Sequence, residues 1–289
     1  MMRSLYSGVS GLKLHQTRMD VIANNISNVN TVGFKSSRVI FSDIYSQTVQ
    51  SASAASEGRG GTNPKQIGLG AQLAAIDTIH NSAATQRTDN PTDLAIEGDG
   101  YFIVKQGTET FYTRAGNLYL DDDGNLVTSG GDFVMGVVGT KGANAEDQTD
   151  GWVDVEEPDD GEITTLSQIN LKDFVGISID SAGVVRGIGT DGETYDVAYI
   201  GLAMFTNPSG LEKIGDTLFA ATPNSGAANY TIAGFNGAGD INPGGLEMSN
   251  VDLASEFTDM IITQRGFQAN SRIITTSDSL LEELVNLKR

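Results

Sequence analysis

Apolar residues recur at alternating steps of three and four at both ends of this chain, and this spacing restricts its fold more than any other feature. It marks a stripe along one side of an α-helix, and such a stripe must be covered by another element. The N-terminal stripe comprises Leu5, Val9, Leu12, Met19, Ile22 and Ile26. The C-terminal stripe lasts about nine turns and comprises Leu253, Phe257, Met260, Gln264, Phe267, Ile274 and Leu281. We therefore expect a long amphipathic helix at each end, covering either the body of its own chain or other helices, including those of neighbouring copies.

Polar residues predict where these helices end and begin. The first helix is expected to end at four asparagines, whose side chains can hydrogen-bond to nearby backbone: Asn24, Asn25, Asn28 and Asn30. Gly33 then allows a turn that a residue with a Cβ would resist. The second helix is expected to begin near Ser249 and Asp252, which have the spacing of a capping box.

Between the two helices, the sequence changes to short runs rich in aromatic and β-branched residues, separated by Gly and Asp clusters. The runs occupy residues 93–104, 111–120, 125–128, 176–180, 184–188 and 198–205. Residues 122–125, Asp-Asp-Gly-Asn, are typical of a hairpin turn. The sequence therefore predicts an α+β protein with long terminal α-helices and an all-β domain, either a sandwich or a barrel.

Two segments fit neither pattern. Residues 46–70 are small, polar and glycine-rich, which indicates an extended connector. Residues 146–162 hold nine acidic residues and no basic residue, which indicates an exposed insertion. A disordered tether is an alternative interpretation of both segments.

Charge and composition exclude several classes of function. The net charge is −19 and only 18 residues are Lys or Arg, so a nucleic-acid partner is not expected. The chain has no Cys, which removes disulfides, thiol nucleophiles and zinc–thiolate sites. No stretch approaches the roughly 20 apolar residues of a membrane span. The N-terminus also lacks the apolar core of a secretory signal, so we expect any export to proceed without a cleaved signal peptide.

Candidate catalytic and metal-binding motifs are weak. Gly98-Asp99-Gly100 lacks the rest of a nucleotide-binding fingerprint, and residues 121–124 lack the spacing of a calcium loop. His15 and His80 have no nearby His or Cys to complete a metal set. We therefore expect no cofactor, metal or enzymatic activity. The alternative of another class is a secreted β-rich glycosidase or adhesin with helical ends, which hydrolysis assays would detect; the acids show no spacing typical of a glycosidase pair.

Three motifs, in order along the chain, resemble bacterial flagellar rod and hook proteins. The first covers residues 2–12 and 16–35, from Met2 through Asn24-Asn25-Ile26-Ser27-Asn28 to Gly33-Phe34-Lys35. The second is internal, at residues 93–102 and 112–116, the latter reading Tyr-Thr-Arg-Ala-Gly. The third runs from Glu247 to Leu253 and from Gln264 to Ser271. The resemblance covers nearly the full chain.

This resemblance implies a tubular homopolymer exported unfolded through the flagellar type III apparatus. The terminal helices, residues 1–34 and 248–289, would form a coiled-coil inner domain around a channel. Residues 35–75 would be an extended connector, and residues 76–247 a β-rich outer domain with the acidic insertion at about 140–165. The stripe residues would then form subunit interfaces. Asn24, Asn25, Asn28 and Asn30, with Gly33 and Phe34, would pack and hydrogen-bond along neighbouring subunits at the end of the inner helix.

The family includes straight rod subunits and the curved hook, a flexible joint that transmits motor torque. Residues 60–70, the C-terminal end and the acidic insertion resemble most the short hook proteins of Gram-positive bacteria. We therefore expect an extracellular hook subunit, with the distal rod of the basal body as the alternative. Expected partners are copies of the same chain, neighbouring rod proteins, hook-cap and hook–filament junction proteins, and the export apparatus.

Overall fold

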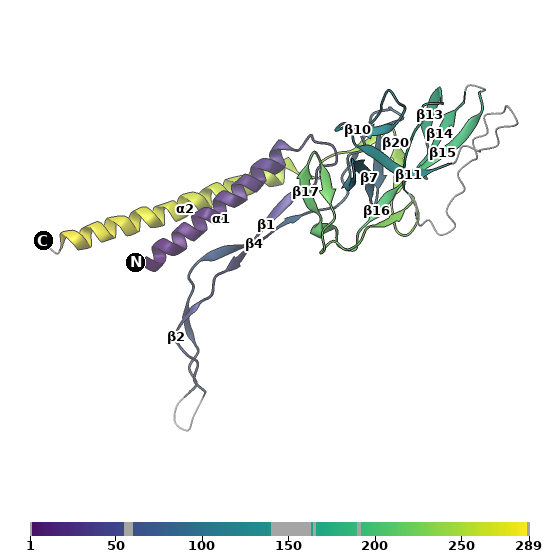
Figure 1. The fold of residues 1–289 in the computed structure, drawn as a ribbon. Coiled ribbons are helices and arrows are strands. Elements are labelled where there is room, and N and C mark those ends of the chain that lie inside the picture. Colours follow the sequence, from purple (N-terminus) through teal and green to yellow (C-terminus); the bar gives the residue numbers. More distant parts are fainter. Residues whose placement is uncertain (1, 55–59, 140–162, 164–165, 190–191, 288–289) are drawn as a thin grey trace. The chain divides into compact units, whose positions relative to one another are not determined.

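The computed structural model describes residues 2–54, 60–139, 163, 166–189 and 192–287 (Figure 1). The chain divides into two compact units that both draw on distant parts of the sequence. The helical unit consists of residues 1–27, 36–79 and 251–289, and the β unit consists of residues 28–35 and 80–250. The chain therefore passes from one unit to the other four times.

In the helical unit, two long helices lie side by side and antiparallel (Figure 1). They are α1 (Met2–Ser27) and α2 (Leu253–Asn286). Both terminal helices predicted from the apolar stripes are thus confirmed. The predicted capping box is wrong in detail: Asp252 itself is the N-cap, and its side chain accepts a hydrogen bond from the Ala254 amide at 3.0 Å. The Ser249 hydroxyl is buried without a hydrogen-bond partner among the described residues, because the helix starts one turn later than its spacing suggested.

The segment after α1, which we expected to be an extended connector, forms paired strands. β1 (Ser37–Asp43) pairs with β4 (Ala71–Thr78), and β2 (Gln47–Gln50) pairs with β3 (Lys65–Ile67), both antiparallel. Burial alternates along β1, with Val39 and Phe41 half-buried and Ile40 exposed. One face of this ribbon packs against α1, where the rings of His15 and Phe41 meet edge to face at 6.3 Å. The sequence did not reveal this pairing, because it depends on the partner strand and on the helix surface.

The β unit is built from antiparallel strands. Its main path runs β13-β14-β15-β11-β7-β8-β18-β17, with β9, β10, β12, β16 and β19 joined at the sides, while β20 pairs with β6 and β21 with β5. The elements are β5 (Thr85–Arg87), β6 (Leu94–Glu97), β7 (Tyr101–Gln106), β8 (Glu109–Thr113), β9 (Leu118–Leu120), β10 (Leu126–Thr128), β11 (Phe133–Val138), β12 (Ser167–Gln168), β13 (Gly176–Ile179), β14 (Val184–Ile188), β15 (Thr194–Ile200), β16 (Leu202–Met204), the 3₁₀ turn η1 (Pro208–Gly210), β17 (Glu212–Gly215), β18 (Leu218–Ala220), β19 (Asn229–Thr231), β20 (Asp240–Pro243) and β21 (Gly245–Glu247).

Strand β7 supplies the centre of the core because both of its faces are covered. Phe102 and Val104 point into one apolar cluster, while Tyr101 and Ile103 point into another. This follows from the two-residue period of a strand, which sends successive side chains to opposite faces. The strands and the hairpin turn expected from the sequence are present, and the α+β class is confirmed. The predicted acidic insertion lies outside the described residues, except for Ile163 near its end.

Candidate functional site

The row of residues through which α1 and α2 touch is mainly small or polar. A Cβ added at Gly11 would stand 2.6 Å from the Asn270 amide, and one at Gly266 would stand 2.6 Å from the His15 ring. Further along, Arg18 pairs with Asp259 at 2.9 Å. Thr263 and Ser277, the buried residues of α2, fall on the same row. Glycine lets the two backbones approach closely here, so the pair is held by close packing and polar contacts.

The predicted apolar stripes lie one residue further along each helix. Leu12, Met19 and Ile26 follow Gly11, Arg18 and Asn25, as Phe257, Met260 and Phe267 follow Glu256, Asp259 and Gly266. One residue corresponds to a rotation of roughly 100° around an α-helix. Most stripe positions therefore flank the contact between the helices of one chain. Ile22 and Ile274 are exceptions: Ile22 is buried on the row of Arg18 and Asn25, and Ile274 lies beside Gly8.

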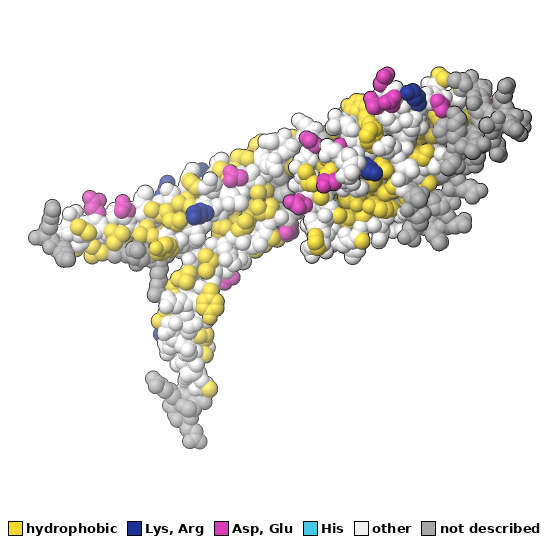
Figure 2. Space-filling view, in the orientation of Figure 1, with side chains coloured by type: hydrophobic (Ala, Val, Ile, Leu, Met, Phe, Trp, Pro, Cys, Tyr) yellow, Lys and Arg dark blue, Asp and Glu magenta, His cyan; other side chains and the backbone are white. Residues whose placement is uncertain are grey.

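Much of the apolar stripe is exposed in the single chain. Val9 is 41% exposed, Leu253 38%, Phe257 50% and Phe267 38%. Gln264 is also exposed; Leu5, Leu12, Met19, Ile26, Met260, Ile274 and Leu281 are half-buried, and Ile22 is buried. Val285, where the alternation along α2 ends, is exposed, as are further large apolar side chains outside the stripe: Ile261, Ile262, Ile273, Leu280 and Leu284. Figure 2 shows hydrophobic side chains along the helix pair and the ribbon. Exposed apolar surface on this scale indicates an interaction surface.

Asn25 is a buried junction within the helical unit. Its side chain is 1% exposed, accepts a hydrogen bond from the Ser37 amide at 3.0 Å and donates to the Ser37 carbonyl at 2.9 Å. It also donates to Glu256 Oε1 at 2.9 Å, and burial raises the pKa of that carboxyl group. The amide therefore ties the end of α1 to the starts of β1 and α2. In the single chain both hydrogens of this amide are donated to Ser37 and Glu256, whereas the expected hydrogen bonds to neighbouring subunits stay a prediction.

The other predicted turn residues lie in and around residues 28–35. Asn24 and Asn30 are exposed, whereas Asn28 is half-buried and accepts a hydrogen bond from Thr31 at 3.1 Å. Gly33 has φ +69°, and a Cβ there would stand 2.5 Å from the Ala115 amide nitrogen. Gly33 is thus required both by its backbone conformation and by the close approach of another segment.

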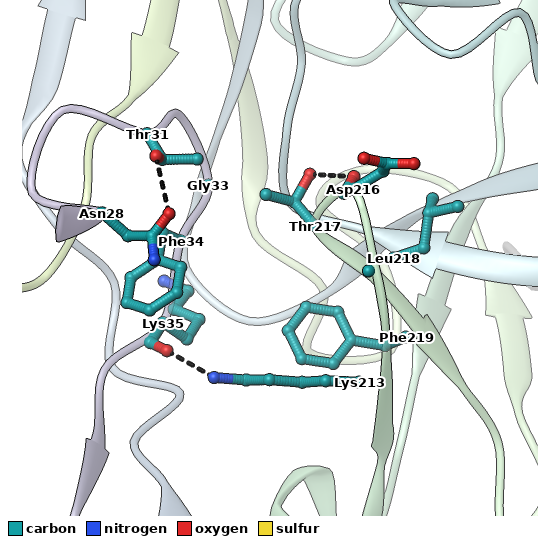
Figure 3. Close-up of a pocket in the computed structure, with 11 residues that line it drawn as sticks. Asn28, Thr31, Gly33, Phe34, Lys35, Lys213, Asp216, Thr217, Leu218 and Phe219 are labelled. Carbon is teal, nitrogen blue, oxygen red and sulfur yellow. Dashed lines mark hydrogen bonds between the residues drawn. The ribbon is translucent and has the colours of Figure 1, made fainter. Parts of the chain in front are cut away.

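A pocket of about 320 Å³ lies between this turn and the hairpin of β17 and β18 (Figure 3). Phe34 and Phe219 contribute apolar walls, and Asp216 and Thr217 form the hairpin tip. The Lys213 amine donates to the Lys35 carbonyl at 2.7 Å and lies 4.9 Å from the centre of the Phe34 ring. These contacts hold Phe34 on the β unit.

The β unit buries an ion cluster that sequence reasoning missed, and we call Lys35, Arg114 and Glu247 the Glu247 cluster. The Lys35 amine contacts Glu247 Oε1 at 2.6 Å, and Arg114 Nη1 contacts Glu247 Oε2 at 3.2 Å. The three side chains are at most 2% exposed. Each belongs to a different one of the three motifs noted in the sequence. The motifs thus meet at one carboxylate.

Backbone groups complete this cluster. The Ala83 amide donates to Glu247 Oε1 at 2.9 Å, and the Gly33 amide donates to the Glu247 carbonyl at 2.8 Å. Lys35 also donates to the Asn81 carbonyl at 2.8 Å. Burial lowers the pKa of the Lys35 amine, and the Glu247 carboxylate partly offsets this effect. Four stretches of chain, at Lys35, residues 81–83, Arg114 and Glu247, are therefore joined by charge-assisted hydrogen bonds, which are stronger than neutral ones.

Two further ionisable groups lie beside the cluster. The Arg114 guanidinium stands 5.2 Å from the centre of the Tyr101 ring, and the Tyr101 hydroxyl lies 2.6 Å from His80 Nδ1. Burial lowers the pKa of His80 to about 4, and the cationic side chains of Lys35, Lys213 and Arg114 add to the effect. Burial raises the pKa of Tyr101 to about 12. Both groups are neutral near pH 7, as a site already rich in cations requires.

In the described part of the chain, the ionisable side chains form no metal-binding cluster. No three His, Cys, Asp or Glu side chains gather there in a way that could hold a metal ion. Neither α1 nor α2 combines the length and apolarity needed to cross a membrane. The features that stand out are the exposed stripes and the two buried junctions, which suit assembly.

Comparisons with known proteins agree with this conclusion. Family profiles match residues 5–35 (flagella basal body rod protein), 95–187 (flagellar hook protein FlgE/F/G D1 domain) and 242–287 (flagellar basal body rod FlgEFG protein C-terminal). The basal-body rod protein FlgG of Bacillus subtilis is 50% identical over 290 aligned residues, covering 100% of both chains. The hook protein FlgE of Borreliella burgdorferi is 36% identical over 441, and FlgG of the same organism 37% over 291, again covering 100% of each chain.

Proposed function

Because this chain belongs to the family of flagellar rod and hook proteins, whose members are structural subunits, we propose that it builds the distal rod of the basal body. The choice of rod differs from our expectation of a hook subunit. It is supported by the identity to FlgG of Bacillus subtilis, which aligns over 290 residues against 289 in this chain. The partners we propose are copies of the same chain and the adjoining axial proteins, reached through the flagellar export apparatus.

The exposed stripes are the observation that supports self-assembly. A closed pair of helices would place its most apolar positions at the contact between them, as coiled coils do. Here the contact within the chain is mainly small and polar, although Ile22 and Ile274 take part, and most of the apolar positions remain beside it. We propose that the stripe residues of both helices are covered by neighbouring subunits, which generates a tube of inner helices with the β units outside.

The hook remains the second candidate because a hook protein also matches over the full length of both chains. That alignment spans 441 positions, however, so the relative has long stretches with no counterpart in these 289 residues. Rod and hook subunits can be distinguished by where they lie in the flagellum.

The test is to place an epitope tag after Gly107, in the exposed turn between β7 and β8 where a Cβ would meet nothing within 4 Å. Motile cells carrying the tagged chain would be used to purify hook–basal-body complexes for gold labelling and electron microscopy. Gold on the straight axial segment is expected for the rod. Gold on the curved external segment would establish the hook, and complexes that lack the tagged chain on immunoblots would refute both.

A further inference from the structure

The Glu247 cluster lies where the chain enters and leaves the β unit. The chain crosses between units at residues 27/28, 35/36, 79/80 and 250/251. Glu247 binds the first crossing segment through Gly33 and Lys35, and it binds the second through Ala83. Its own strand, β21, leads to the last crossing. Glu247 therefore holds residues close to three of the four crossings, at 35/36, 79/80 and 250/251.

Stability alone does not explain why this cluster is charged. Desolvating an ion pair can cost more than the attraction between its charges, and apolar residues of similar volume are often equally stable in its place. Ionic hydrogen bonds, however, have fixed directions and distances, whereas apolar contacts allow several packings. Removing the charges should therefore loosen the positions of the crossing segments more than it destabilises the unit.

The helical unit has a matching arrangement on its own side. Asn25, the last residue but two of α1, binds Ser37 just after the 35/36 crossing and Glu256 just after the 250/251 crossing. Residues 28–35 thus run between two buried junctions, Asn25 at one end and Lys35 at the other. Both junctions are made of directional polar contacts.

We propose that the Glu247 cluster is a positioning device that sets the paths by which the chain enters and leaves the β unit, so that every subunit of the axial polymer adopts one conformation. This proposal rests on the proposed function, because uniform subunits are what a regular tube needs. Lys35, Arg114 and Glu247 fix geometry in this account, and the apolar stripes supply the association energy.

The test compares the unmodified chain with a triple variant, Lys35→Met/Arg114→Met/Glu247→Leu. Its thermal unfolding midpoint is expected to stay close to that of the unmodified chain. Backbone hydrogen exchange at Gly33 and Ala83 should accelerate at least tenfold, while exchange at core residue Ile103 stays unchanged. Incorporation into isolated hook–basal-body complexes, in competition with the unmodified chain, should fall at least tenfold.

The matched control removes an exposed ion pair, Arg186→Met/Asp196→Leu, which should change none of these quantities. If the triple variant fails to fold, the conservative Glu247→Gln variant is measured in the same way. Unchanged exchange at Gly33 and Ala83 in a folded variant would overturn the positioning role, and so would faster exchange with normal incorporation. Exchange is measured on the unassembled chain, so this part holds or fails independently of whether the protein is a rod subunit.

Discussion

Truncating Phe257 tests whether the apolar stripe is the surface through which subunits associate. Phe257 is 50% exposed in the single chain. A Phe side chain offers about 150–250 Å², so about 100 Å² remains to be covered on assembly. Loss of most of this area in Phe257→Ala should weaken association by about 2 kcal/mol, at about 25 cal/mol per Å². This corresponds to a rise of about 30-fold in the critical concentration for polymerisation.

The assay is sedimentation of polymer from the purified chain over a series of concentrations. The control is Gln268→Ala, because Gln268 is exposed and lies off both the stripe and the row that contacts α1. Phe257→Ala should also lower the free energy of unfolding of the single chain by about 2 kcal/mol, because the other half of the side chain is buried there, so the variant is shown to be folded before its polymerisation is compared. If both variants polymerise at the same concentration as the unmodified chain, the stripe is not the interface. A chain that stays monomeric at every concentration would refute self-association.

Three further predictions concern the buried contacts. The pKa of His80 is about 4 in the folded chain and 6.5 in model compounds, so the folded chain favours the neutral imidazole. The free energy of unfolding should therefore keep its full value above pH 6.5 and fall as the pH is lowered towards 4. The loss is at most about 3 kcal/mol, and a His80→Phe variant should lack that part of the pH dependence in urea unfolding curves. Gly266→Ala should lower the thermal unfolding midpoint, although Ala favours the helix. The added Cβ would meet the His15 ring at 2.6 Å, and such overpacking costs about 1–3 kcal/mol. A midpoint at or above that of the unmodified chain would contradict the close helix contact. Asn25→Ala should lower the free energy of unfolding by about 2 kcal/mol, because it leaves buried groups unpaired. The control, Asn30→Ala at an exposed position, should change it by less than about 0.5 kcal/mol. Equal effects of the two variants in chemical denaturation would show that Asn25 is not a buried junction.

Local patterns in the sequence were sufficient for both helices and for part of the β unit. The 3.6-residue period predicted the helices, and aromatic and β-branched runs predicted β6 to β10, β13, β14 and β16 but not the central strand β11 or the strands from β17 to β21. These signals are local because each depends on which face of one element is apolar. The pairing of β1 with β4 was missed because a ribbon of mixed exposure has no strong period of its own. The three motifs were also sufficient to identify the family.

Tertiary structure alone decided which residues meet. Periodicity identifies an apolar stripe but does not say what covers it, and the helices of one chain touch along the neighbouring row, where Gly11 and Gly266 allow close approach. The Glu247 cluster joins residues separated by 212 and 133 positions in the sequence, so no local sequence pattern could predict it. Asn25 similarly binds Glu256 across 231 positions. The apolar pattern of each element can be seen in its own sequence. The partners of buried polar groups cannot, because these contacts depend on distance and direction in the folded chain.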